Sequence, residues 1–193
     1  MIHFLRSHKM PAAILVALIQ CGILGYMIQS RASILQNGRE VTLQTEPVDP
    51  RDLMRGDYVT LGYSITRFPA TEIEGGLNTY FKEASPVYVA LKQGEGGIWE
   101  KSRASVTPFS DLKPDEVLIA GRAEYGFTPQ TSDNLRVTYG IERFYVPEGE
   151  GNSIEEGQSE RRIMAKIMID GAGKAQMKAL MDNGTALYEE PIY

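Results

Sequence analysis

The side chains from which most catalytic triads and zinc sites are built occur only at the start of this chain. The histidines are His3 and His8, and the single cysteine is Cys21. The rest of the chain therefore lacks the general base of a Ser-His-Asp triad, a thiol nucleophile and the usual zinc ligands. Ser-Lys chemistry, carboxylate chemistry or no chemistry remains. We predict no catalytic residue, no metal site and no cofactor.

Two serine-containing fragments match short motifs of penicillin-recognising enzymes. Ser110-Asp111-Leu112-Lys113 fits the pattern S-x-x-K, and Ser132-Asp133-Asn134 fits S-D-N. The first pattern needs a helix that brings serine and lysine together, but Pro114 follows at once and no Lys-Thr-Gly sequence is present. We expect both fragments to be loops.

Carboxylates could support hydrolysis or bind calcium. A glycosidase needs two carboxylates across a cleft, and calcium needs six or more oxygen ligands. The acidic residues from Glu148 to Glu156 show no EF-hand spacing, so an ordinary solvated loop is the simpler interpretation of this group. A carboxylate-dependent hydrolase acting on envelope substrates stays open as the alternative to a non-catalytic role. The two groups are Asp49, Asp52 and Asp57, and Glu148, Glu150, Glu155 and Glu156.

The region around Asp49, Asp52 and Asp57 resembles part of the signal peptidases. In those enzymes a membrane anchor precedes a β domain, and a Pro-x-Leu-x-x-Gly-Asp run enters a strand. Pro50, Leu53, Gly56 and Asp57 carry the likeness, although this chain has one extra residue between the proline and the leucine. It implies a nucleophilic serine a few residues before the proline, where this chain offers only Thr45. A degenerate enzyme of this kind is therefore a second form of the alternative.

A predicted β-strand from Asp57 to Ile65 positions the acidic residues and the signal-peptidase-like run that lead into it. Apolar residues alternate in it with polar or small ones, which is the period of a strand with one buried face. Gly62 has no side chain to pack and marks a bulge or a close approach of another backbone. Tyr58 lies opposite the apolar face, so it is the aromatic residue best placed to contact a ligand. The apolar set is Val59, Leu61, Tyr63 and Ile65.

This strand also carries a family resemblance. Gly56-Asp57-Tyr58, Leu61 and Tyr63 match in full the signature of the bacterial GDYXXLXY family, and the runs 139–150 and 165–188 are similar to its second half. The resemblance implies a membrane-tied domain of unknown function and transfers no catalytic residue. Because the tripeptide opens a strand, we expect the signature to be architectural. A possible binding surface around it consists of Arg51, Asp52, Arg55 and Tyr58.

Further short alternating stretches, separated by glycine and proline, predict a mostly β fold. We expect an antiparallel β-sandwich or a partly closed barrel, with one short helix near Ser153–Glu156. Lys174–Met181 contains good helix formers, but its alternation favours a strand. Within Leu135–Val146 the apolar positions change from odd to even, which predicts a bulge near Glu142. The other predicted strands are Glu40–Gln44, Val117–Tyr125, Arg162–Asp170, and a hairpin of Val87–Leu91 with Ile98–Val106.

The N-terminus predicts a membrane anchor. Pro11–Ile28 has Gln20 as its only strongly polar residue, and a helix rising about 1.5 Å per residue is just long enough to cross a bilayer there. Cleavage as a signal peptide near Ser30-Arg31-Ala32 is the rival interpretation. We favour an anchor with a cytoplasmic segment 1–10, a transmembrane helix 11–29, a juxtamembrane linker 30–39 and an extracytoplasmic β domain 40–193. Arg6 and Lys9 place the N-terminus inside.

Charge and helix composition suggest partners. The net charge is −5, and because residues 1–31 contribute three positive charges and no negative one, the remainder carries −8, which argues against nucleic-acid binding. Small residues recur every fourth position in the predicted span and could form a helix-packing face, with chance as the alternative: Ala13, Ala17, Cys21 and Gly25. We therefore expect a non-catalytic binding or accessory subunit in the bacterial inner membrane. Its partner would be a membrane protein or a second copy.

Overall fold

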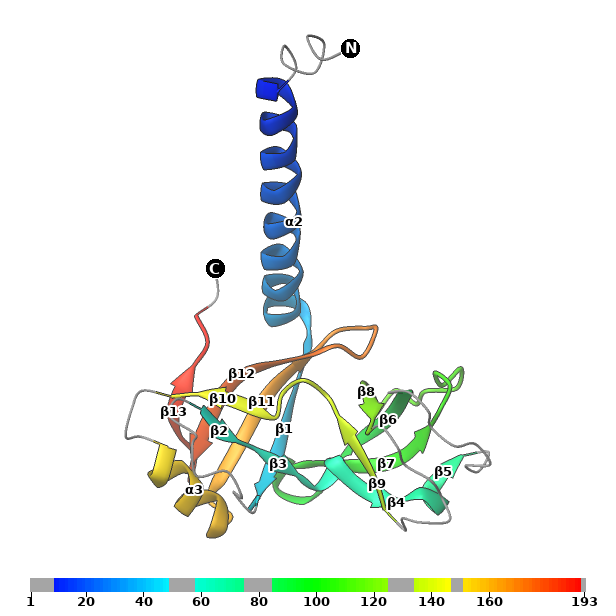
Figure 1. Cartoon of the computed structure of the whole chain (residues 1–193). Coiled ribbons are helices and arrows are strands. Elements are labelled where there is room, and N and C mark those ends of the chain that lie inside the picture. The colour runs from blue at the N-terminus through cyan, green and yellow to red at the C-terminus, as the bar shows by residue number, and fades with distance from the viewer. Residues whose placement is uncertain (1–8, 49–57, 75–84, 125–133, 147–150, 192–193) are drawn as a thin grey trace.

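A computed structural model of the whole chain describes residues 9–48, 58–74, 85–124, 134–146 and 151–191. It confirms a mostly β fold preceded by one long N-terminal helix (Figure 1). Two larger sheets and a two-stranded ribbon contain the described strands. Their inner faces share one hydrophobic core, so the sheets fold together.

The N-terminal helix, α2 (Lys9–Asn37), stands on the β domain, which contacts its base and leaves its apolar stretch uncovered (Figure 1). Met10–Asn37 is long and apolar enough to cross a membrane, and its most apolar stretch of 18 residues has a mean hydropathy of 2.0. The predicted span 11–29 lies inside this helix, and residues 30–37, which we expected as a linker, continue it. At about 1.5 Å per residue, this extension reaches roughly 12 Å beyond the predicted span.

The helix passes directly into the first sheet. Gly38 donates its backbone N–H to Ile34 O at 2.9 Å, and β1 (Arg39–Glu46) begins at the next residue. A Cβ on Gly38 would lie 2.6 Å from Ile34 O and 3.0 Å from Ile169 N, so this close approach requires glycine. Ile34 and Leu35 are buried against Met168. The helix base is therefore packed on the sheet.

The first sheet has the order β13-β12-β11-β1-β3. Its central pair is antiparallel, and the predicted strand in Lys174–Met181 is confirmed as β12. The predicted short helix is present as α3 (Gly151–Ser159), although it begins before Ser153, which therefore does not cap it. The remaining strands are β3 (Gly62–Tyr63), β11 (Ile163–Ile169), β12 (Ala175–Asp182) and β13 (Thr185–Glu189).

The second sheet has the order β4-β9-β8-β6-β7-β5. The predicted hairpin is confirmed as β6 and β7, joined through a 3₁₀ turn in which Gly96 and Gly97 have positive φ. The short β5 pairs with β7 in parallel, an exception to the expected antiparallel arrangement. The strands are β4 (Arg67–Pro69), β5 (Ile73–Glu74), β6 (Pro86–Gln93), β7 (Trp99–Ser105), β8 (Glu116–Ala123) and β9 (Asn134–Thr138).

The predicted strand from Asp57 to Ile65 is divided. β2 (Tyr58–Thr60) pairs with β10 (Arg143–Tyr145), β3 pairs with β1, and a 3₁₀ turn covers Ser64–Thr66. The predicted alternation nevertheless holds, because its four apolar residues are each at most 2% exposed. The close approach predicted at Gly62 is confirmed, since a Cβ there would lie 2.8 Å from Glu46 O.

The bulge predicted near Glu142 is wrong. The run 135–146 is instead two strands, β9 in the second sheet and β10 in the two-stranded ribbon. Between them the chain turns at Gly140, whose φ is +84°. A change of sheet therefore causes the switch of apolar positions that the sequence shows.

Candidate functional site

A groove lies where the run that contains β2 and β3 meets the run that contains β9 and β10. β2 and β3 form one part of it, and β4, β9 and the turn before β10 form another. The lining mixes apolar, aromatic and charged groups. Its residues are Glu46, Pro47, Val48, Tyr58, Thr60, Leu61, Gly62, Thr66, Arg67, Arg136, Thr138, Gly140, Glu142 and Arg143.

Two buried tyrosines hold these runs together behind the groove. Tyr63 donates its hydroxyl to Ile141 O at 2.9 Å, and Tyr139 donates its hydroxyl to Ile65 O at 2.8 Å. Burial, assisted by the charge of Glu142, raises the pKa of both phenols above the ordinary value. Both hydroxyls therefore remain protonated donors, which suits a structural role.

The carboxylate of Glu142 closes the turn before β10. Its Oε1 accepts from Tyr139 N at 2.5 Å, and its Oε2 accepts from Gly140 N at 2.8 Å. The backbone of Glu142 in turn accepts from Leu61 N at 2.8 Å. Of the two carboxylates that line the groove, Glu46 and Glu142, one is thus engaged in the fold on both oxygens. This argues against a pair that shares acid–base work.

The signature divides between this scaffold and the groove surface. Leu61 and Tyr63 are buried at 1% and 2% exposure, whereas Tyr58 is half-buried and lines the groove. The ring of Tyr58 lies 6.0 Å from that of Tyr145, and the Arg143 guanidinium lies 5.7 Å from its centre. Tyr145 is 70% exposed. Tyrosine and arginine are enriched at protein interfaces.

Only part of the predicted binding surface is placed. Tyr58 reaches the groove, while Arg51, Asp52, Arg55, Gly56 and Asp57 lie outside the described residues. The sequence reasoning missed the groove arginines Arg67, Arg136 and Arg143, because they lie far apart along the chain. A signal existed for Arg136, which occupies an outward position between the inward Leu135 and Val137.

The fragments suggestive of enzymes that fall within the described residues are not assembled for chemistry. Residues 110–113 contain no helix, as expected, and Lys113 donates its backbone N–H to Glu116. Thr45 is fully buried and donates its hydroxyl to Ile163 O at 2.8 Å, so it is not a nucleophile. Ser132 and Asp133 lie outside the described residues. In the described part of the chain, no group of three or more histidine, cysteine, aspartate or glutamate residues could hold a metal ion.

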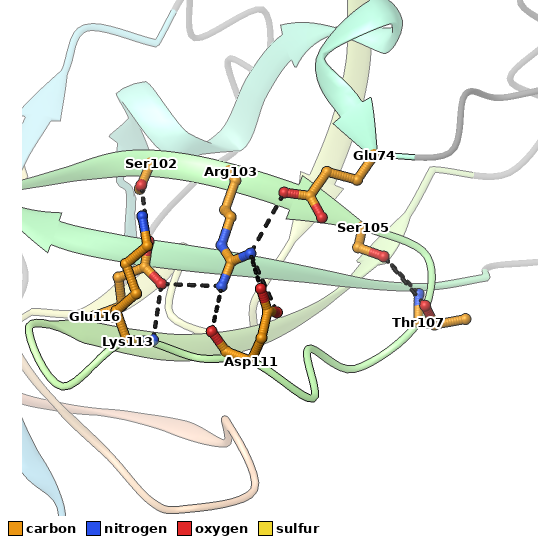
Figure 2. Close-up of polar contacts among 8 residues, drawn as sticks. All are labelled: Glu74, Ser102, Arg103, Ser105, Thr107, Asp111, Lys113 and Glu116. Atoms are coloured by element: carbon orange, nitrogen blue, oxygen red, sulfur yellow. Dashed lines mark hydrogen bonds and ion pairs between the residues drawn. The ribbon is translucent and has the colours of Figure 1, made fainter.

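A second polar cluster surrounds Arg103 on β7 (Figure 2). Arg103 binds Asp111 through Nη1 at 3.0 and 3.2 Å, and its Nη2 lies 3.1 Å from Glu116 Oε2. Glu116, only 3% exposed, also accepts from Ser102 Oγ at 3.0 Å and from Lys113 N at 3.1 Å. The cluster thus ties the loop between β7 and β8 to the sheet.

Electrostatics keep Glu116 ionised in this cluster. Burial raises its pKa, but the hydrogen bonds from Lys113 and Ser102 and the charge of Arg103 outweigh burial, so the pKa lies below its ordinary value. The Arg103 guanidinium also stacks 4.4 Å from the ring centre of Phe109. A carboxylate so fully hydrogen-bonded acts as a structural anchor rather than as a proton donor.

The chain is similar to one known protein family. A model of the family described as GDYXXLXY protein matches residues 20–180. The chain belongs to the GDYXXLXY protein family. The match covers both divided runs, the groove and the lower part of α2, so the GDYXXLXY unit includes the junction at Gly38. Comparisons with curated proteins and with solved structures give no match.

Proposed function

We propose that this GDYXXLXY protein is a single-pass protein of the bacterial inner membrane whose β domain lies outside the cytoplasm and binds a partner protein without catalysis. The supporting observation is the groove, where signature residue Tyr58 faces outward beside Tyr145 and Arg143. The buried signature residues Leu61 and Tyr63 act as its scaffold. A carboxylate-dependent hydrolase has weaker support, because Glu142 is held by two backbone N–H groups.

The proposed orientation predicts the behaviour of reporter fusions. Arg6 and Lys9 precede the apolar helix, and positive charge next to a span favours the cytoplasmic side. Alkaline phosphatase fused after Tyr193 should therefore be active in cells, while a reporter that works only in the cytoplasm should be inactive at the same point. The reverse pattern would refute the orientation.

The groove proposal predicts a position-specific contact in native membranes. A photo-crosslinking amino acid at Tyr145, the exposed strand partner of the groove residue Tyr58, should yield a discrete adduct that mass spectrometry can identify. The same probe at Lys92, an exposed position at the end of β6, should not yield that adduct. Tyr58→Ala should lower the yield from Tyr145. Identical adducts from both positions, or none from Tyr145, would count against a binding role for the groove.

The transmembrane helix is the second proposed contact. Within the described residues, a Cβ added at Gly25 would meet no atom within 4 Å, which is compatible with a neighbouring helix packing on the small-residue face. If that face contributes, Ala17→Leu combined with Cys21→Leu will lower the Tyr145 adduct yield without changing membrane insertion. If the adduct yield is unchanged, the groove alone remains as the proposed contact, and the recurrence of small residues at every fourth position in the helix is due to chance.

A further inference from the structure

Arginines gather on the exposed face of the second sheet beside the groove. Arg67 of β4 stands directly opposite Arg136 of β9, and Arg122 of β8 stands opposite Thr138. All four side chains are exposed. Residues two apart on a strand share a face, and so do register partners. The three arginines therefore project from the same side of the sheet.

This arrangement is unfavourable for the isolated domain. Like charges directly opposite one another destabilise a sheet. The nearest compensation is Glu124, whose carboxylate lies 3.6 Å from Arg136 Nε, but both side chains are about half exposed and such pairs contribute little. Within the described part of the chain, the Arg67 side chain has no hydrogen-bond or ion-pair partner. An anion placed between Arg67 and Arg136 would relieve the repulsion.

The arginine pair opens into the groove and not onto the membrane. Arg67, Arg136 and Thr138 line the same groove as Tyr58 and the exposed Val48, so cationic and apolar side chains share one lining. Figure 1 places β4 and β9 on the side of the domain away from α2. Headgroups of the bilayer that this helix would cross are therefore out of reach.

We propose that the groove binds an extended acidic segment of a partner protein, with a carboxylate held between Arg67 and Arg136 and an apolar side chain against Tyr58. Arginine suits this role because its planar guanidinium matches carboxylate oxygens in a fork. The net charge of −8 after residue 31 opposes a long polyanion such as nucleic acid, which would extend beyond the groove. This inference rests on the proposed binding function and names the chemistry of the partner.

The test uses the full chain in detergent and a short fluorescent peptide in which glutamate alternates with leucine and tyrosine. A matched peptide carries glutamine in place of glutamate. Fluorescence anisotropy should show that the acidic peptide binds at least about tenfold more tightly than the neutral one, and less tightly as salt increases. The double variant Arg67→Gln with Arg136→Gln should lose about tenfold in affinity, by the same loss of charge pairing.

Controls separate binding from folding. Arg161→Gln removes an exposed arginine in the turn after α3 and should leave peptide affinity unchanged. The double variant should unfold at the same temperature as the wild type or higher, because repulsion is removed. Equal affinity for both peptides, or a double variant that binds normally, would overturn the inference. Competition by inorganic phosphate at matched ionic strength would do so too, because it would indicate a site for a small oxyanion.

Photo-crosslinking at Tyr145 in native membranes distinguishes failure of the acidic-segment inference from failure of the binding function itself. If Tyr145 captures a partner whose yield is insensitive to Arg67→Gln with Arg136→Gln, the acidic-segment inference fails and the binding function stands. If Tyr145 captures nothing, the binding function itself fails. A yield reduced by the double variant and unaffected by Arg161→Gln supports both.

Discussion

Replacement of Tyr63 by alanine is expected to lower the free energy of unfolding by about 3 to 5 kcal/mol, the usual cost of deleting a large buried aromatic side chain. Tyr63 is 2% exposed and belongs to the shared core. Its hydroxyl also satisfies the backbone carbonyl of Ile141, next to the turn that Glu142 closes. The loss should therefore weaken both the core and the wall of the groove.

Urea unfolding of the full chain in mild detergent measures this change. Trp99 is the only tryptophan and is 6% exposed, so its fluorescence reports on the β domain alone. Tyr63→Phe should cost about 1 to 3 kcal/mol, since it leaves the Ile141 carbonyl without its donor. Tyr58→Phe is the matched control on the groove surface and should change stability little. Wild-type stability in Tyr63→Ala would mean that this part of the signature does not serve the fold.

Glu116→Gln is expected to lower the free energy of unfolding by about 1 to 3 kcal/mol near neutral pH, because a buried carboxylate loses charge-assisted bonds. Glu116 accepts hydrogen bonds from Ser102, Arg103 and Lys113 through its two carboxylate oxygens. Glutamine has an NH₂ donor in place of one of these oxygens, so it cannot accept all three bonds. Glu100→Gln, on the exposed side of β7, is the control and should have little effect.

The pH dependence of this difference follows from the lowered pKa of Glu116. The unfolded chain has the higher pKa, near the ordinary value of 4.5, so stabilisation is fully present above that pH. It is lost as the pH falls through the lower folded pKa. The stability gap between wild type and Glu116→Gln should therefore be constant around neutrality and narrow in acid. A gap that widens in acid would show that the folded pKa is raised instead.

Local periodicity was sufficient for much of the fold. The strands β1, β6, β7, β11 and β12 were predicted, because a period of two depends only on which neighbouring residues are apolar. The same reasoning predicted that Leu61 and Tyr63 face inward and that Gly62 meets another backbone. Apolar length alone predicted the candidate membrane helix, and the signature residues together with the runs 139–150 and 165–188 predicted the family.

Periodicity could not predict where strands end. The breaks at Leu61 and at Tyr139–Glu142 arise because consecutive short strands pair with different partners, and pairing is a property of distant segments. Residues 30–37 continue the helix, and Ile34 and Leu35 in this part pack on Met168. Met168 is far away in sequence, so local periodicity gives no sign of this contact. The parallel pairing of β5 with β7 has no local signal either.

The candidate site depended most on tertiary structure. The sequence alone indicated Tyr58, since it opposes the apolar face of its own strand. Arg67, Arg136 and Arg143 come from three strands, and only the register of β4 with β9 and of β2 with β10 brings them into the groove that Tyr58 also lines. Residue types and their spacing act over a few neighbours, so they determined the inward and outward faces of strands. The groove exists only because strand pairing joins outward faces from separate parts of the chain.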